Sequence, residues 1–159
     1  MMQSSLVYLL AFGIGFVTGL RSMTGPALVC WAAHLGWINL EGSRLVFMES
    51  PLATYGFSAL ALGELVADKL PFIPNRTSPG PLFGRVVLGA LSGATLCAAT
   101  GCSLAGGAIL GGVGGAIGAF AGYRARARLV KTSRLPDWVV ALLEDLFAVG
   151  SGLFLVSRF

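Results

Sequence analysis

The sequence predicts an all-α integral membrane protein, a single domain of residues 1–159 with about five transmembrane helices. Of its residues, 55% are hydrophobic and only 11% are charged, whereas a soluble domain usually carries about 25% charged residues. With a mean hydropathy of +0.81, the chain has too few polar residues to cover the surface of a soluble protein. The apolar residues also fall into runs of roughly 20 residues, the length that crosses a bilayer.

The first apolar run, Leu6 to Leu20, is interpreted as a retained span, because no small-residue cleavage pattern follows it. Segment 21–26 reads Arg-Ser-Met-Thr-Gly-Pro. Its proline removes a backbone donor and its hydroxyl groups can satisfy freed backbone groups, so we expect the first helix to be broken there. The apolar piece 27–40 is too short for a comfortable span. It either spans as the outer half of a long broken helix, re-enters the membrane or lies at the interface.

Four further spans are expected, from Pro51 to about Leu70, from Arg85 to about Thr100, over 104–123 and over 136–158. The third of these is rich in glycine at four-residue spacing, which permits close approach of another helix. The glycines concerned are Gly107, Gly111, Gly115, Gly118 and Gly122. This face meets either another span of the chain or a second copy in a homo-oligomer.

Basic residues concentrate in two connecting segments, 69–85 and 124–134. With five spans, both segments fall on the same side of the membrane. The positive-inside rule makes that side cytoplasmic. The expected topology therefore has a cytoplasmic N-terminus and an extracytoplasmic C-terminus.

A short internal repeat relates 14–22 to 117–125, both of which read Ile-Gly-x-x-x-Gly-x-Arg-small. Each is followed by a span that contains Ala-Leu-x-Glu. In the expected topology the matching spans run in opposite directions, so the pattern predicts an inverted repeat of spans 1–2 against spans 4–5, a common transporter design. Such a repeat brings Glu64 and Glu144 to similar depth. The alternative is a coincidence of glycine- and alanine-rich composition.

Acidic residues in the apolar runs are the main candidates for function. Carboxylates within a membrane are costly and face a partner charge, the bundle interior or a water-filled path. Four residues apart, Glu64 and Asp68 share one helix face. The candidate substrate or ion pathway consists of Arg21, Thr24, Glu64, Asp68, Glu144 and Asp145. The candidate anchors in the cytoplasmic connections are Asn75, Arg76, Arg85 and Arg124. Ion pairs that only hold the bundle together are the structural alternative.

Four segments carry a family resemblance: 19–27 (Gly-Leu-Arg-Ser-Met-Thr-Gly-Pro-Ala), 64–71, 75–85 and 143–145 (Leu-Glu-Asp). Together they resemble an uncharacterised bacterial membrane family, the domain of unknown function 4126. The resemblance covers nearly the whole chain and is most specific over 64–85. It implies a small multi-pass protein of the bacterial inner membrane, and it implies no particular activity.

The leading functional hypothesis is a small transporter or channel for protons, small ions or a small solute that uses intramembrane carboxylates. One alternative is a membrane enzyme acting on a lipid-linked phosphate, with Asp68, Arg76 and Arg85 binding a metal and a phosphate. It is less favoured, because no paired Asp-x-x-Asp motif is present and the single histidine, His34, lies in the short apolar piece. A structural or assembly protein is the third class. We expect the lipid bilayer as partner, no cofactor and no nucleic acid.

Overall fold

The computed structural model describes residues 3–67, 77–133 and 136–159, and within these ranges it contains helices and no strand. The elements are α1 (Ser4–Leu20), α2 (Thr24–His34), the 3-10 helix η1 (Val46–Glu49), α3 (Pro51–Ala67), α4 (Pro79–Ala99), α5 (Leu104–Ser133) and α6 (Asp137–Val156). The predicted all-α membrane class is confirmed. By length and composition, α4, α5 and α6 are candidate membrane spans, while α1 and α3 are shorter apolar helices.

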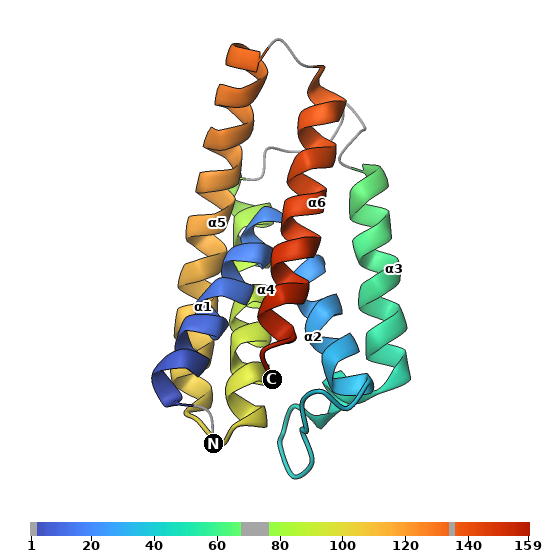
Figure 1. The fold of residues 1–159 in the computed structure, drawn as a ribbon, viewed down its shortest axis with the longest axis vertical. Coiled ribbons are helices and arrows are strands. Elements are labelled where there is room, and N and C mark those ends of the chain that lie inside the picture. The colour runs from blue at the N-terminus through green and yellow to red at the C-terminus, as the bar shows by residue number, and fades with distance from the viewer. Residues whose placement is uncertain (1–2, 68–76, 134–135) are drawn as a thin grey trace.

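At the predicted break the chain does not bend but reverses its direction. After a turn at 21–23, α2 runs back toward the end of the molecule where α1 begins (Figure 1). With 11 residues, α2 is about 16 Å long and cannot cross a bilayer. The chain after the turn therefore runs back, and α1 and α2 form a hairpin. The predicted break at 21–26 contains this turn, although Thr24, Gly25 and Pro26 already belong to the first turn of α2, where proline is tolerated.

Glycines of α5 contact two helices of the same chain. On one side of α5, a Cβ at Gly115 would lie 2.6 Å from the carbonyl oxygen of Arg85, and Gly111 meets Gly89 of α4 equally closely. On the other side, Gly118 lies against the backbone of Phe16 in α1. Any side chain there would force the helices apart. Of the two partners left open for this glycine face, another span or a second copy, the structure has α1 and α4 of the same chain against it.

The direction of α1 differs from the prediction. Gly15 lies against Gly111 and Gly19 lies against Gly115, so residue numbers rise together and α1 runs parallel to α5. An inverted repeat of these helices requires opposite directions. The two similar segments therefore run in the same direction in the structure, because the reversal at 21–23 adds a change of chain direction that the five-span count omitted.

The reversal also moves the N-terminus. Both termini lie at one end of the molecule, and α3 and α5 run from there to the other end (Figure 1). Basic residues of the α5 end therefore lie opposite the N-terminus. The prediction had placed the N-terminus and the basic residues of this segment on the same side of a membrane, whereas here they lie at opposite ends of the molecule.

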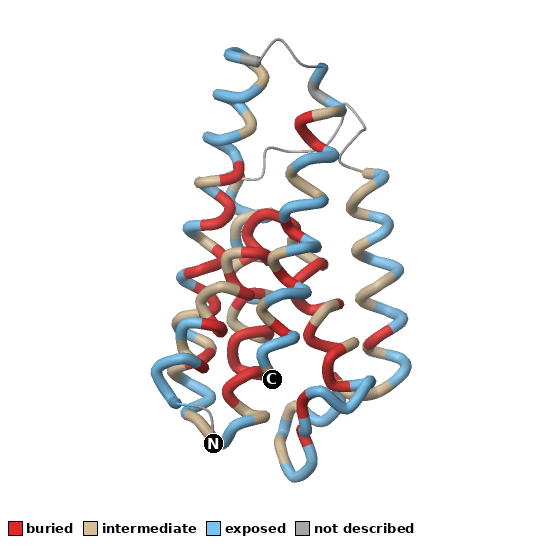
Figure 2. Tube along the Cα trace, viewed as in Figure 1, coloured by how far each residue is buried: buried red, intermediate tan, exposed pale blue. Residues whose placement is uncertain are grey.

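The apolar core lies between α1, α2, α4 and the 38–48 segment, toward the end that carries the termini. Its largest members are Ile14, Leu40, Met48 and Leu96, all with no exposed surface. In contrast, α3 packs chiefly against α2 and η1. Within Pro51–Ala67 only Thr54 is buried, and Figure 2 shows the mostly pale surface of this helix.

Candidate functional site: the charged cluster at the α1–α2 turn

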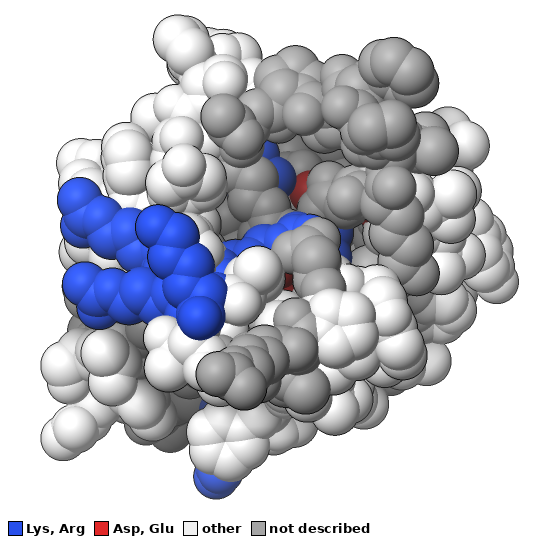
Figure 3. All heavy atoms as spheres, turned by 90° about the horizontal axis from the view of Figure 1, so that it is seen from above, with Lys and Arg blue, Asp and Glu red and all other residues white. Residues whose placement is uncertain are grey.

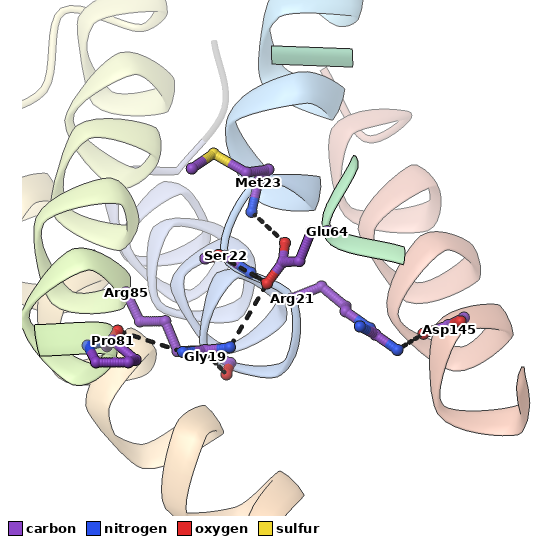
Figure 4. Close-up of polar contacts among 8 residues, drawn as sticks. All are labelled: Gly19, Arg21, Ser22, Met23, Glu64, Pro81, Arg85 and Asp145. Atoms are coloured by element: carbon purple, nitrogen blue, oxygen red, sulfur yellow. Dashed lines mark hydrogen bonds and ion pairs between the residues drawn. The ribbon is translucent and has the colours of Figure 1, made fainter. Parts of the chain in front are cut away.

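A buried ion pair joins the turn to α6. Arg21, which follows the last residue of α1, is 2% exposed, and its guanidinium contacts the carboxylate of Asp145. The side chain of Asp145 is 14% exposed. Figure 4 shows Arg21 extending from the turn across to α6. Because both charges lie among apolar helices, each depends on charged or hydrogen-bonding neighbours for its stability.

A second carboxylate, that of Glu64, covers the beginning of α2. One oxygen accepts hydrogen bonds from the backbone nitrogen of Ser22 (2.9 Å) and from its hydroxyl (2.7 Å). The other accepts from the backbone nitrogen of Met23 (3.0 Å). Amides at a helix start have no intrahelical partner and form the positive end of the helix dipole. Ser22 and Met23 precede the first residue of α2, so Glu64 of α3 satisfies two amides of the turn that leads into this helix (Figure 4).

Arg85 of α4 completes the cluster. One of its terminal nitrogens lies 3.5 Å from Glu64, Nε donates to the carbonyl of Gly19 (3.1 Å), and Nη1 donates to that of Pro81 (3.3 Å). The Gly19 carbonyl belongs to the last turn of α1, where carbonyls lack helical partners. Arg85 thus links α1, α3 and α4, and the residue predicted as an anchor in a connection lies inside the bundle.

The cluster lies closer to one end of the spans than to the other. Arg85 and Asp145 each follow the start of their helix by about two turns, or roughly 10 Å. Seen from that end, the molecule has a central hollow in which both basic and acidic atoms are visible (Figure 3). On the opposite side of the cluster lies the apolar core around Ile14 and Leu96. The apolar core thus borders the cluster on the side toward the termini.

The remaining predicted residues are placed differently. Thr24 is buried at the start of α2, where its amide donates to the carbonyl of Arg21. Glu144 lines a separate pocket between α1, α5 and α6. Arg124 is exposed on α5. Asp68, Asn75 and Arg76 lie outside the described residues.

Sequence reasoning missed four partners of the cluster, namely Ser22, the amide of Met23 and the carbonyls of Gly19 and Pro81. The polarity of the turn was a signal for Ser22, since its hydroxyl and amide needed a partner. Nothing in the local sequence pointed to a carbonyl of α1. Among the residues that the structure describes, no group of three or more His, Cys, Asp or Glu side chains is placed to hold a metal ion.

The cluster lies within a stretch that matches a known family. The model of the family described as Domain of unknown function (DUF4126) matches residues 8–157. The chain belongs to this family. The resemblance carried by segments 19–27 and 64–85 is thereby confirmed, and these DUF4126 segments supply Arg21, Glu64 and Arg85. Comparison with the curated proteins and with the solved structures found no match.

Proposed function

We propose that this DUF4126 protein is a membrane transporter or channel that passes a small ion or small solute through the charged cluster at the α1–α2 turn. The observation that carries the proposal is the pair of largely buried ion contacts Arg21–Asp145 and Arg85–Glu64, which lie among apolar helices. Apolar packing would stabilise a bundle at least as well as buried ion pairs do. Ionisable groups retained inside a membrane protein are therefore candidates for a pathway.

The hairpin supplies the binding geometry. The turn before α2 directs two backbone amides into the cluster, much as the breaks of discontinuous helices do around substrates in transporters. Glu64 occupies these amides. A proton on Glu64 weakens its hold on the amides and on Arg85, and an incoming anion competes for the same donors. Either event frees the end of α3, which packs chiefly against α2 and η1.

For orientation, we propose that the basic end of α5 is cytoplasmic, in line with the positive-inside rule. Both termini are then extracytoplasmic, and the hollow of Figure 3 opens to the cytoplasm. Single cysteines introduced at positions 43 and 128, in a variant without the native cysteines, test this. Labelling from outside intact cells should reach position 43 and not 128, and the reverse pattern contradicts the proposal.

The other two classes receive less support. The phosphate-site hypothesis combined Arg85 with Asp68 and Arg76, but Arg85 contacts Glu64 and two backbone carbonyls within the bundle. An assembly role through the glycine face is weakened, because α1 and α4 cover Gly111 and Gly115.

Proteoliposome flux tests the proposal. Wild-type protein is reconstituted with a pH-sensitive dye inside and challenged with gradients of H⁺, Na⁺, K⁺ and Cl⁻. Glu64→Gln keeps the side-chain shape and removes the charge. Glu41→Gln removes an exposed carboxylate from the connection between α2 and η1 and is the matched control.

We expect flux in the wild type and in Glu41→Gln, and at least a tenfold loss in Glu64→Gln, about the effect of one charge-assisted contact. Equal flux in wild type and Glu64→Gln, together with a lower melting temperature of the variant, would assign Glu64 a structural role. Wild-type vesicles no leakier than empty ones for every ion tested would reject the ion pathway.

A further inference from the structure

A pocket of about 290 Å³ lies between α1, α5 and α6, away from the charged cluster. Its walls are apolar, with Phe16 and Leu20 from α1, Leu129 from α5 and Leu143 and Phe147 from α6. Three of these side chains are half exposed or more: Leu129 at 50%, Leu143 at 52% and Phe147 at 61%. The pocket is therefore an apolar groove on the outer surface of the bundle, where lipid surrounds the protein.

Two charged residues also line the groove, Arg126 and Glu144. Their charges balance each other. The surplus charge comes from the neighbouring exposed residues of α5, namely Arg124, Arg128 and Lys131. No acidic residue occurs anywhere in Leu104–Ser133. The polar end of the groove is thus surrounded by positive charge.

The depth of Arg126 matches a lipid phosphate. The apolar part of α5, Leu104 to Tyr123, has about 20 residues and a length of roughly 30 Å, the thickness of the hydrocarbon core. Arg126 follows its end by about 5 Å, at the level of the headgroups. Phe16, Leu20 and Phe147 lie deeper, on the hydrocarbon side of Arg126.

We propose that this groove binds one anionic membrane phospholipid. Its phosphate lies at Arg126, within the positive field of the α5 end, and one acyl chain runs along Phe16, Leu20 and Phe147. The argument for a lipid over a protein helix is this match of charge and depth, because a transmembrane partner helix needs small-residue contacts and no basic cluster. The site does not depend on the proposed transport function.

Native mass spectrometry of the full-length protein, released from micelles, tests the proposal with defined amounts of phosphatidylglycerol or phosphatidylethanolamine. Arg126→Gln removes the charge inside the groove. Ala125→Phe fills the groove from an exposed position on the same helix. Arg128→Gln removes the same charge two residues away, outside the groove lining, and is the matched control.

We expect wild type to bind phosphatidylglycerol about tenfold more tightly than phosphatidylethanolamine, because the ammonium of phosphatidylethanolamine offsets the phosphate charge and is repelled by the basic end of α5. Arg126→Gln should lose this preference, Ala125→Phe should lose binding of both lipids, and Arg128→Gln should stay within about twofold of wild type. Melting temperatures establish whether each variant is folded. If Arg126→Gln does not fold, the loss of lipid binding in Ala125→Phe tests the proposal.

Three results would overturn the proposal. Equal losses in Arg126→Gln and Arg128→Gln would show diffuse attraction to the basic end. Equal binding of the two lipids by wild type would exclude recognition of an anionic headgroup. A dimer that disappears in Ala125→Phe would make the groove an interface between copies of the chain. Flux measurements are independent of all three results.

Discussion

Two glycine-containing helices of this protein, α5 and α3, are held in opposite ways. Gly111 and Gly115 of α5 touch the backbones of both α1 and α4, so these three helices form one rigid unit. In α3, a methyl group added at Gly56 or Gly63 would meet nothing within 4 Å. Instead, side-chain contacts connect this helix to its neighbours, with Glu64 near one end and Ser58 in the middle. The same residue type thus serves backbone packing in one helix and no packing in the other.

This difference indicates where motion occurs. Close helix packing in lipid is stabilised by many weak contacts between backbones, which cannot open one at a time. Polar contacts of a single carboxylate can be exchanged by protonation or by a competing ion. We therefore infer that α1, α4 and α5 form the scaffold and that α3 is the element that responds to the state of the cluster.

The largest effect should come from adding a methyl group to the scaffold. Gly111→Ala places Cβ against the carbonyl of Gly89, and overpacking of this kind should cost about 3 kcal/mol. Gly56→Ala is the matched control, where open space and better helix propensity predict a gain of up to about 1 kcal/mol. Unfolding in mixed micelles with increasing denaturing detergent measures both. Equal stabilities of the two variants would remove the contrast between α5 and α3.

Breaking the ion pair to α6 should have the next largest effect. Arg21→Met leaves Asp145 without its guanidinium contact, at a cost of about 2–3 kcal/mol, below the value for a fully buried pair because the side chain of Asp145 is 14% exposed. Replacing both residues, as Arg21→Met with Asp145→Leu, removes the uncompensated charge and should recover at least half of that loss. If the free-energy costs of the two single substitutions simply add in the double variant, Arg21 and Asp145 are not energetically coupled.

Glu64→Gln should act locally, at a cost of about 1–2 kcal/mol, because glutamine keeps an acceptor for the amides of the turn but not the charge. The expected result is a change of hydrogen exchange that is confined to one part of the chain. Hydrogen exchange should accelerate over 51–67 and stay unchanged over 104–123. Equal acceleration in both segments would show that α3 belongs to the same rigid unit as α5.

The smallest effect is expected at the middle of α3. Ser58→Ala removes the hydrogen bond that Trp31 Nε1 donates to the serine hydroxyl (2.9 Å), at a cost of about 1 kcal/mol. Ser151→Ala on α6 is the control, since that hydroxyl bonds within its own helix. Melting temperatures should separate the two variants. If they do not, the Trp31–Ser58 bond contributes nothing to the attachment of α3.

The sequence was sufficient for the class of fold and for the position of the break. Low charge and apolar runs determine a helical membrane protein, and Pro26 beside hydroxyl residues marks the end of a helix. The reversal was not predictable, because the turn is stabilised by Glu64, Arg85 and Asp145, all distant in sequence. A short apolar piece after a break is equally compatible with continuing, lying flat or turning back.

The site was predicted in part for a related reason. Arg21, Glu64 and Asp145 could be named because charges in apolar runs need partners. Their pairing depends on helix rotation, about 100° per residue, so Asp145 faces Arg21 whereas its neighbour Glu144 lines the lateral groove. The repeat at 14–22 and 117–125 describes a packing surface, and such a pattern carries no information on helix direction.

The hairpin also sets the order in which the protein can be assembled. Arg21 leaves the ribosome roughly 120 residues before Asp145, an interval of about 6–25 s at 5–20 residues per second. The glycine surface against which α1 packs belongs to α5, and it does not exist until α5 has been synthesised. During this interval the tip of the hairpin has neither its counter-charge nor its packing partner, and it is stable only in a hydrated place. We therefore expect the α1–α2 hairpin to dock late, after the helices that surround it have been inserted.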